Sequence, residues 1–410
     1  MRFVRLTLIL SVVLGLVASA NAQAESTDEN ERLIGFWEQC DTPASLPETV
    51  EIGLVASITG PISFYGAPQE DGVVMALEEI NASGYLGEST LSVIVEDSAS
   101  DPTYSEAIAA VTKLTEQDDV TAVLGPTLSS EAFAAAPVAQ ENQTPILGLS
   151  NAAEDLPQTI GEYYFRALMP ESTMIPYTVD ASQGYAALEQ VAVLYGDDDD
   201  FTLSGYDAFI DALLDSDITI TREETFQRGD TDFNAQLTNI VSDEPDAIVV
   251  AALAAEAVPI ITQARSLGFT GPIIGGNGLN APGIISGAEA DAAGVLVGTS
   301  YHPSSTDPLT ARFTADFQER YGYEPDQFAA HAYTGAWIIA TAIRCADSAE
   351  RDAVRDALET QITDFASPIG AFSFDENRDP VYPRLLQEVQ NGQFVVVERE
   401  EEAPALQDTN

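Results

Sequence analysis

The stretch Val50-Glu51-Ile52-Gly53-Leu54-Val55, which leads into Thr59-Gly60-Pro61, indicates the fold class of this chain. Its apolar residues predict a short strand, and the Gly-Pro pair after it predicts a sharp turn. From residue 68 to 81, apolar residues then recur at the spacing of one helix face. A strand, a turn and an amphipathic helix in this order begin a βαβ unit, which favours a parallel sheet.

The same alternation continues through two runs of the chain. Helical patterns separate the predicted strands, and two long helices are expected at 309–321 and 327–346. The sequence therefore predicts an α/β fold of two doubly wound parallel-sheet lobes. Because ligands bind beyond the carboxyl ends of parallel strands, two lobes that face each other predict a cleft. The further strands are expected at 91–96, 120–124, 145–149, 191–195, 218–226, 247–252, 272–275 and 295–299.

The chain is long and strongly acidic. Its 410 residues are too many for one ordinary core and predict two domains. It has 66 Asp and Glu against 16 Lys and Arg, a formal net charge of -50. This charge repels phosphates, so nucleic acid is excluded as a partner. It also destabilises the compact state by self-repulsion, which molar salt screens, and we infer an acidic, halophilic protein.

The first residues have the pattern of an export signal. Arg2 and Arg5 precede an almost wholly apolar run, and small residues at Ala20–Ala24 fit a signal-peptidase site. A cleavable signal peptide is expected at 1–24, followed by an acidic extension at 25–48, so the protein is expected to be periplasmic or secreted. The alternative is a retained membrane anchor, although the apolar run is shorter than the ~20 residues of a comfortable span.

The chain contains two cysteines, Cys40 in the extension and Cys345 near the end of a predicted helix. In an oxidising compartment such a pair favours a disulfide, which here pins the extension to the body of the protein. Two unpaired thiols remain the alternative, because sequence alone does not supply the geometry.

Loops at the ends of the predicted strands carry the candidate binding residues. Tyr65 offers a ring face and a hydroxyl. Ser129 and Ser130 stand where a helix begins, and they can cap it. The free N–H groups and the dipole at that helix start also suit a carboxylate. The four loops lie at 59–66, 125–131, 150–155 and 275–278.

Several runs in order resemble the branched-chain amino-acid binding proteins, which are type I periplasmic binding proteins of ABC importers. Each run alone is weakly specific, but their joint order and spacing over roughly 49–395 make the resemblance strong. It implies the type I periplasmic binding fold, with two lobes joined by a three-strand hinge. The matching runs are 53–61, Tyr65-Gly66, Gly72 with 76–81, 123–126 with Ser129, 135–139, 263–268 and 272–276.

The resemblance also implies roles for individual residues. Ser129 matches the position that bonds the ligand carboxylate, and Ala152 matches one whose backbone contacts the polar head of the ligand. Tyr65 matches an aromatic residue on the ligand, and Ser130 is a further candidate next to Ser129. For Ser129 and Tyr65 the alternative roles are a helix cap and an ordinary ring in the cleft wall.

Other positions depart from the family pattern. Asn277 stands where the family usually has an acid that meets the ligand ammonium, and Glu154 stands where many members have a threonine. Glu154 can meet the ammonium instead, or the ligand is not an α-amino acid; both residues can also be simple loop residues. Leu253 falls where an aromatic often closes over the ligand, and Tyr333 lies in a helix near the cleft. For these two, core packing is the favoured alternative.

Sequence motifs typical of enzymes are weaker in this chain than the match to the binding-protein family. Gly276-x-Gly278-x-x-Ala281 formally fits a dinucleotide fingerprint, but it lies late in its lobe. His302 and His331 cannot form a zinc cluster, and no Gly-x-Ser-x-Gly motif is present. The run Asp197–Asp200 is read as a solvated loop rather than a calcium site. No cofactor or metal is therefore expected, and an extracytoplasmic hydrolase is disfavoured.

The sequence thus predicts a monomeric solute-binding protein that closes its lobes on an amino acid or related small carboxylate. It is expected to deliver this solute to the membrane permease of an ABC importer. The alternative is a ligand sensor of the same fold that presents the solute to a membrane receptor. Predicted bounds are 49–169 plus 300–370 for lobe 1, 170–299 plus 371–397 for lobe 2, and 398–410 for a flexible tail.

Overall fold

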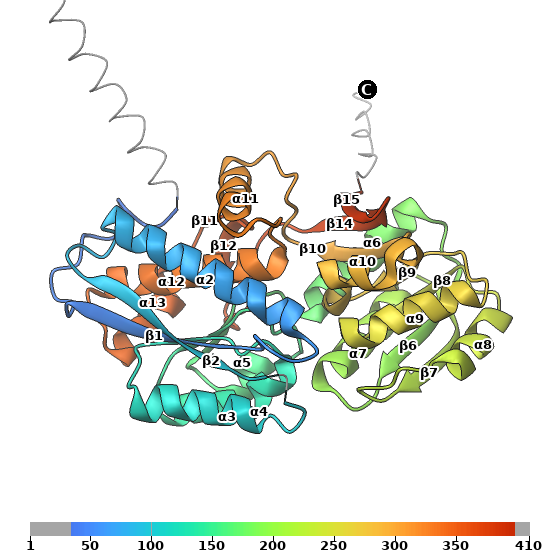
Figure 1. The fold of residues 1–410 in the computed structure, drawn as a ribbon, viewed down its shortest axis with the longest axis horizontal. Coiled ribbons are helices and arrows are strands. Elements are labelled where there is room, and N and C mark those ends of the chain that lie inside the picture. Colours follow the sequence, from blue (N-terminus) through green and yellow to red (C-terminus); the bar gives the residue numbers. More distant parts are fainter. Residues whose placement is uncertain (1–33, 100, 398–410) are drawn as a thin grey trace, which may run out of the picture.

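A computed structural model describes residues 34–99 and 101–397, which form two α/β lobes side by side (Figure 1). The predicted signal peptide, the first part of the extension and the predicted tail lie outside the described residues. Within the described ranges, no helix is both long enough and apolar enough to cross a bilayer.

The first lobe is built on a wholly parallel sheet with the strand order β2-β1-β3-β4-β5. Buried side chains join α2 and α12 to one face of this sheet, and α3 and α4 to the other. Each strand is thus covered on both faces, which explains its near-continuous apolar sequence. The strands are β1 (Thr49–Ala56), β2 (Thr90–Asp97), β3 (Val123–Leu124), β4 (Ile146–Gly148) and β5 (Tyr164–Arg166). The helices are α2 (Ser63–Ser83), α3 (Ser105–Thr112) with the π-helical turn η1 (Lys113–Gln117), α4 (Ser129–Glu141), α5 (Leu156–Ile160), α11 (Pro308–Tyr321), α12 (Gln327–Ala346) and α13 (Arg351–Gln361).

The second lobe is built on a sheet with the order β15-β14-β10-β9-β8-β6-β7. Only β14 and β15 run antiparallel to their neighbours. Helices α6 and α7 cover one face, and α8, α9 and α10 cover the other. The strands are β6 (Gln190–Gly196), β7 (Thr219–Phe226), β8 (Ala247–Ala251), β9 (Ile273–Gly275), β10 (Val295–Thr299), β14 (Leu385–Gln390) and β15 (Gln393–Val396). The helices are α6 (Glu171–Tyr185), α7 (Asp200–Asp215), α8 (Asn234–Ser242), α9 (Ala254–Ser266), α10 (Pro282–Ala288) and the 3-10 turns η2 (Asn277–Leu279) and η3 (Glu289–Ala292).

The chain passes between the lobes after β5, after β10 and before β14. A small antiparallel sheet of β11 (Phe365–Ser367), β12 (Gly370–Phe374) and β13 (Pro380–Val381) precedes the third passage. We expected 371–397 in lobe 2, but Phe372 and Tyr382 pack in the core of the first lobe. Leu386 packs in the second. We therefore propose that the lobe boundary lies after Tyr382 rather than at 370.

The part of the N-terminal extension that the structure describes is fastened to the first lobe. Cys40 and Cys345 form a disulfide with a Cα–Cα distance of 5.0 Å. The Arg344 guanidinium donates to the carbonyls of Cys40, Trp37 and Tyr85. The extension therefore covers one end of α12 instead of lying free.

Candidate functional site

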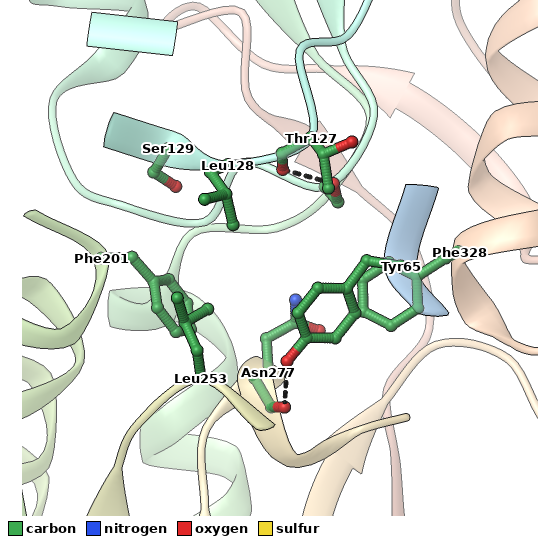
Figure 2. A pocket seen from close by; sticks show the side chains of 10 residues that line it. Tyr65, Thr127, Leu128, Ser129, Phe201, Leu253, Asn277 and Phe328 are labelled. Carbon is green, nitrogen blue, oxygen red and sulfur yellow. Dashed lines mark hydrogen bonds between the residues drawn. The ribbon is translucent and has the colours of Figure 1, made fainter. Parts of the chain in front are cut away.

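A narrow pocket lies between the two lobes (Figure 2). The loops after β3 and β4 and the starts of α2 and α12 supply its first-lobe wall. The loops after β6, β8 and β9 supply the opposite wall, so the site lies at the carboxyl ends of the strands, as predicted. Its lining residues are Tyr65, Thr127, Leu128, Ser129, Ser150, Phe201, Leu253, Asn277, Gly278 and Phe328.

Most of the wall is apolar. The rings of Tyr65 and Phe328 pack with their centroids 4.7 Å apart on the first lobe. Leu128 adds an aliphatic side chain there, and Phe201 and Leu253 face it from the second lobe (Figure 2). This lining suits a small ligand whose greater part is hydrocarbon.

The Tyr65 hydroxyl joins the two lobes. It donates to the Gly278 carbonyl at 2.7 Å and accepts from the Ala254 N–H at 2.9 Å. Burial raises the pKa of Tyr65 well above its usual value, so the phenol stays neutral and keeps its proton for Gly278. Both partners belong to the second lobe, so the described conformation is closed. The ring of Tyr65, rather than its hydroxyl, is then available to a ligand.

Ser129 is the polar group best prepared for an incoming anion. Its Oγ accepts the N–H groups of Ala152 at 3.1 Å and Ala153 at 3.2 Å. These two bonds use the acceptor capacity of a hydroxyl and leave its proton to donate. No described residue accepts that proton. Ser129 is also the first residue of α4, whose first-turn N–H groups have no partners within the helix. The site can therefore give a carboxylate several donors and a favourable dipole.

The other hydroxyl groups of this wall, those of Thr127 and Ser150, already have hydrogen-bond partners within the protein. Thr127 donates to Oε1 of Gln69 at 2.7 Å and accepts the Ser57 N–H at 2.9 Å. Ser150 donates to the Thr127 carbonyl at 2.7 Å and accepts from Nε2 of Gln69 at 2.7 Å. These bonds hold the loops after β3 and β4 together and leave Ser129 as the open hydroxyl of the wall.

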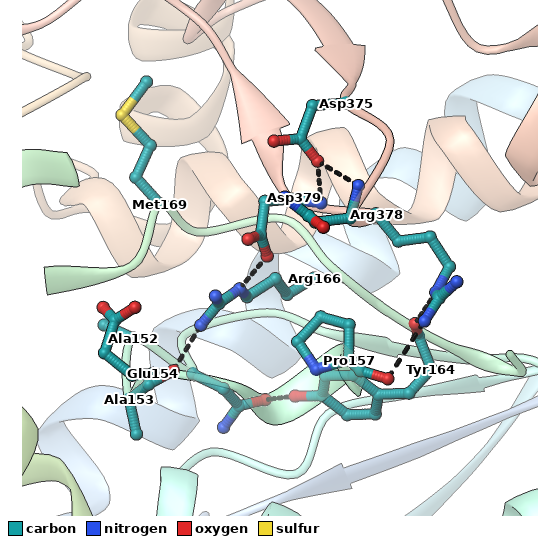
Figure 3. A network of polar contacts seen from close by, with 12 residues as sticks. Ala152, Ala153, Glu154, Pro157, Tyr164, Arg166, Met169, Asp375, Arg378 and Asp379 are labelled. Carbon is teal, nitrogen blue, oxygen red and sulfur yellow. Dashed lines mark hydrogen bonds and ion pairs between the residues drawn. The ribbon is translucent and has the colours of Figure 1, made fainter. Parts of the chain in front are cut away.

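A buried network also fixes the loop that carries Ala152. Arg166 is 1% exposed, and its guanidinium donates to the Ala153 carbonyl at 2.5 Å and to Oδ1 of Asp379 at 2.5 Å. Figure 3 shows Arg166 between these two groups. Arg378 binds the carbonyls of Tyr164 and Pro157 in the same region. These bonds fix the backbone of the loop whose two N–H groups, those of Ala152 and Ala153, orient the Ser129 hydroxyl.

The second lobe contributes the side-chain amide of Asn277 and the buried carboxyl group of Glu171. Oδ1 of Asn277 accepts from Nε2 of Gln327 at 2.6 Å, which is a further bond between the lobes. The Asn277 N–H donates to Oε1 of Glu171 at 2.8 Å. Burial raises the pKa of Glu171 to about 8, with a smaller contribution from the charge of Glu154.

Next to the pocket residue Ser129, the buried acid Asp199 lies close to an arginine. Ser130 donates to Oδ2 of Asp199 at 2.9 Å across the lobes. Arg228 lies 4.0 Å from the same oxygen and donates to the Tyr104 hydroxyl of the first lobe at 3.3 Å. Burial raises the pKa of Asp199, while Ser130 and Arg228 act to lower it. The lobes therefore meet here in a charged contact rather than in apolar packing.

The structure brings some predicted residues to the pocket and leaves others outside. Tyr65, Ser129, Leu253 and Asn277 line it. Ser130 and Ala152 stand directly beside it through the contacts described above. Glu154 does not line it, because its Oε1 accepts the Ser172 N–H at 2.9 Å and its own N–H donates to Ser204 at 2.8 Å.

Tyr333 lies away from the pocket, although its helix reaches it. Its ring packs on Phe313 in the core of the first lobe, and its hydroxyl donates to Glu79. Core packing, the alternative that the sequence favoured, describes its position. The part of α12 that reaches the pocket is its first turn, through Phe328.

The patterns that formally resembled other sites have structural explanations. A Cβ on Gly278 would lie 2.2 Å from the Ala252 carbonyl oxygen, so close packing requires this glycine. His331 is fully buried and bonded to the Gln327 carbonyl, and burial lowers its pKa to about 4. The prediction of a solvated loop at Asp197–Asp200 is wrong for Asp199, which is 4% exposed and caps α7 through the N–H groups of Phe201 and Thr202.

Comparison with known proteins identifies the family. A model of periplasmic binding proteins matches residues 49–393. The chain belongs to the periplasmic binding protein family. This confirms the resemblance seen in the sequence, and members of this kind are solute-binding proteins rather than enzymes.

Named relatives and solved structures agree with this assignment. The leucine-, isoleucine-, valine-, threonine- and alanine-binding protein of Pseudomonas aeruginosa is 24% identical over 340 residues, covering 81% of this chain and 87% of that protein. The Leu/Ile/Val-binding protein BraC3 of Rhizobium johnstonii is 26% identical over 332 residues, covering 80% and 88%. The branched-chain amino acid transporter substrate binding protein LivJ of Streptococcus pneumoniae, in complex with isoleucine, has a TM-score of 0.80 and 27% identity, with 85% of this chain and 99% of that chain covered. These matches confirm the predicted fold.

The sequence did not reveal every residue that matters here. Phe328 belongs to a helix that is buried on nearly all sides, so the spacing of its apolar residues does not single out the ones that face the pocket. Glu171 has the appearance of an ordinary acid in the first turn of a helix. Arg228 has a stronger signal, since it is one of few basic residues in a very acidic chain and follows the strand β7.

Proposed function

We propose that this protein captures a small carboxylate-bearing solute, an amino acid or a related small acid, by closing its lobes. The observation that carries the proposal is the open Ser129 hydroxyl at the start of α4, in a pocket whose other walls are mostly apolar. The donor end suits a carboxylate, and the rings and leucines suit a short hydrocarbon chain. The amino acids named for the relatives combine these two features.

The protein captures its ligand in two steps. The ligand first binds the wall of Tyr65, Ser129 and Ala152, because that wall is fixed within one lobe. The second lobe then closes and forms the Tyr65–Gly278, Ser130–Asp199 and Asn277–Gln327 bonds. Closure shields the polar contacts from water, and a ligand favours it only by binding the closed form more tightly.

The closed protein then delivers the solute to the permease of an ABC importer outside the cytoplasm. Support comes from LivJ, which is named as the substrate binding protein of a branched-chain amino acid transporter, and from the export signal predicted at 1–24. Presentation of the solute to a membrane receptor differs in the partner, not in the pocket. Uptake into vesicles that contain a cognate permease separates transport from sensing.

A thermal-shift screen in molar salt tests ligand capture. The panel contains the common amino acids, aliphatic and aromatic acids, and amines without a carboxylate as matched controls. At a ligand concentration 100 times its Kd, a binder adds about 2.7 kcal/mol to the stability of the protein, which a melting curve resolves easily. We expect at least one amino acid or small acid to stabilise the protein and the amines to have little effect. No response to any carboxylate would overturn the proposal.

A further inference from the structure

A buried carboxyl group that bonds the pocket residue Asn277 has a hydrogen-bond partner for only one of its two oxygens. Glu171, the first residue of α6, is 1% exposed. Its Oε1 accepts the Asn277 N–H at 2.8 Å, but its Oε2 is buried and has no hydrogen-bond partner among the described residues. A buried polar atom without a partner is costly, and a carboxylate oxygen most of all. A donor from outside the chain would satisfy this atom.

The position of Glu171 connects it to both walls of the cleft. Its backbone N–H donates to the Ala152 carbonyl at 2.9 Å on the first-lobe side. On the other side it holds the loop of Asn277, which lines the pocket. The loop comes close because residue 276 is glycine: a Cβ there would lie 2.8 Å from Oε1. Glu171 thus contacts Ala152 through its backbone N–H and the pocket residue Asn277 through its carboxyl group.

Among the described residues, no Lys, Arg or His forms an ion pair with Glu171. The groups that act on its carboxyl are the Asn277 N–H and the charge of Glu154, which is also negative. Glu154 itself is engaged by the Ser172 N–H and is not fully buried. A buried acid with an acidic neighbour and no basic partner is suited to receive a positive charge from a ligand.

We propose that Oε2 of Glu171 binds the ammonium group of the ligand, so that the pocket selects α-amino acids over acids that lack the amino group. The Ala152 carbonyl, which can accept a second bond, is a further acceptor at this place. Ser129 then holds the carboxylate end of the same molecule. This inference rests on the proposed function and adds the residue that determines specificity, at a position other than 154 or 277.

Proton release follows from this arrangement. In the ligand-free protein the raised pKa of about 8 keeps Glu171 mostly protonated at pH 7. An ammonium group beside the carboxyl favours its ionised form and lowers the pKa. The carboxyl proton then passes to the buffer when the amino acid binds. Glu154 faces the same carboxyl, so its influence needs a control.

The test compares L-leucine with 4-methylpentanoate, which is the same molecule without the amino group. Calorimetry in molar salt measures both affinities for the wild type, for Glu171→Gln and for the control Glu154→Gln. Glutamine keeps the size of the side chain and the oxygen that accepts the Asn277 N–H. We expect the wild type and E154Q to prefer leucine by about 10- to 100-fold, and E171Q to lose most of that preference. Affinity of E171Q for 4-methylpentanoate should stay within a few-fold of the wild type.

The wild type alone supplies a second measurement, which does not depend on the folding of any variant. Titration at pH 7 in two buffers of different ionisation enthalpy should show protons released with leucine and none with 4-methylpentanoate. Equal binding of both probes by the wild type, or an unchanged preference in E171Q, would overturn the role of Glu171 and leave the proposed function intact. Binding of neither probe, together with no response in the broader screen, would overturn both.

Discussion

The hydroxyl of Ser130 donates a hydrogen bond of 2.9 Å to Oδ2 of Asp199, and this bond joins the first lobe to the second. Both side chains are buried, and Arg228 approaches the same carboxylate from the second lobe. Ser129, the preceding residue of the helix, faces the pocket instead. Two adjacent serines therefore have separate tasks: one is prepared for the ligand and the other stabilises closure.

Replacement of Ser130 by alanine should weaken binding of every ligand by a similar factor. The variant removes a hydrogen bond to a charged group that exists only in the closed form, worth about 1.5–3 kcal/mol. The matched control is Ser105→Ala, which removes a Ser–Asp bond within the first lobe. Calorimetry with two different ligands checks the prediction. A loss confined to one ligand, or an equal loss in S105A, would contradict it.

The melting temperature of the ligand-free protein should rise strongly between 0.1 M and 2 M sodium chloride. The net charge of -50 makes the folded state repel itself, and salt shortens the range of that repulsion. Potassium chloride at equal ionic strength should give a similar rise, because screening depends on ionic strength. Calorimetric melting curves that are insensitive to salt would refute the inferred halophilic character.

Glu171 should make the ligand-free protein more stable as the pH falls from about 8 towards 5. Burial raises its pKa from 4.5 to about 8, so in this range the folded protein holds a proton that the unfolded chain has lost. The contribution of Glu171 is complete below the unfolded pKa and is lost as the pH rises through the folded one. The difference in stability between E171Q and the wild type should therefore grow with pH, by at most about 1.4 kcal/mol per pH unit. Urea unfolding at several pH values measures it, and parallel curves would argue against it.

Loss of the disulfide should reduce stability without affecting the site. The double variant Cys40→Ser, Cys345→Ser removes a cross-link between residues 305 positions apart, typically worth about 2–4 kcal/mol. Cys345 and Phe328 lie near opposite ends of α12, about 25 Å apart at 1.5 Å per residue. Denaturant unfolding should show the loss, whereas calorimetry should show unchanged ligand affinity. A large change in affinity would mean that the extension acts on the cleft.

The sequence predicted the parts of the molecule that local patterns control. Strands buried on both faces have continuous apolar runs, and this made the βαβ order visible. Ser129 was visible because a serine that follows a strand and starts a helix has few alternative positions. The cysteine pair followed from the expected compartment. The family resemblance then added the order of the loops around the cleft.

The remaining features depend on contacts that no local pattern encodes. Helix α12 is buried on nearly all sides, so its sequence does not tell that Phe328 faces the pocket and Tyr333 the core. The orientation of Glu154 is decided by the Ser172 N–H. Glu171 is buried only because the loop of Gly276 and Asn277, about a hundred residues later, closes over it. Such long-range packing determined where the acids of the cleft lie.

Binding of L-leucine and of 3-methylbutylamine, its analogue without the carboxylate, to the wild type and Ser129→Ala tests the central claim most directly. Calorimetry in molar salt should show that S129A weakens leucine binding by about 10-fold or more, because a buried carboxylate loses its donor. The weak binding of the amine should change little, and a melting curve of S129A confirms that the variant is folded. An unchanged affinity of S129A for leucine would contradict the assignment of this cleft as a carboxylate-binding site.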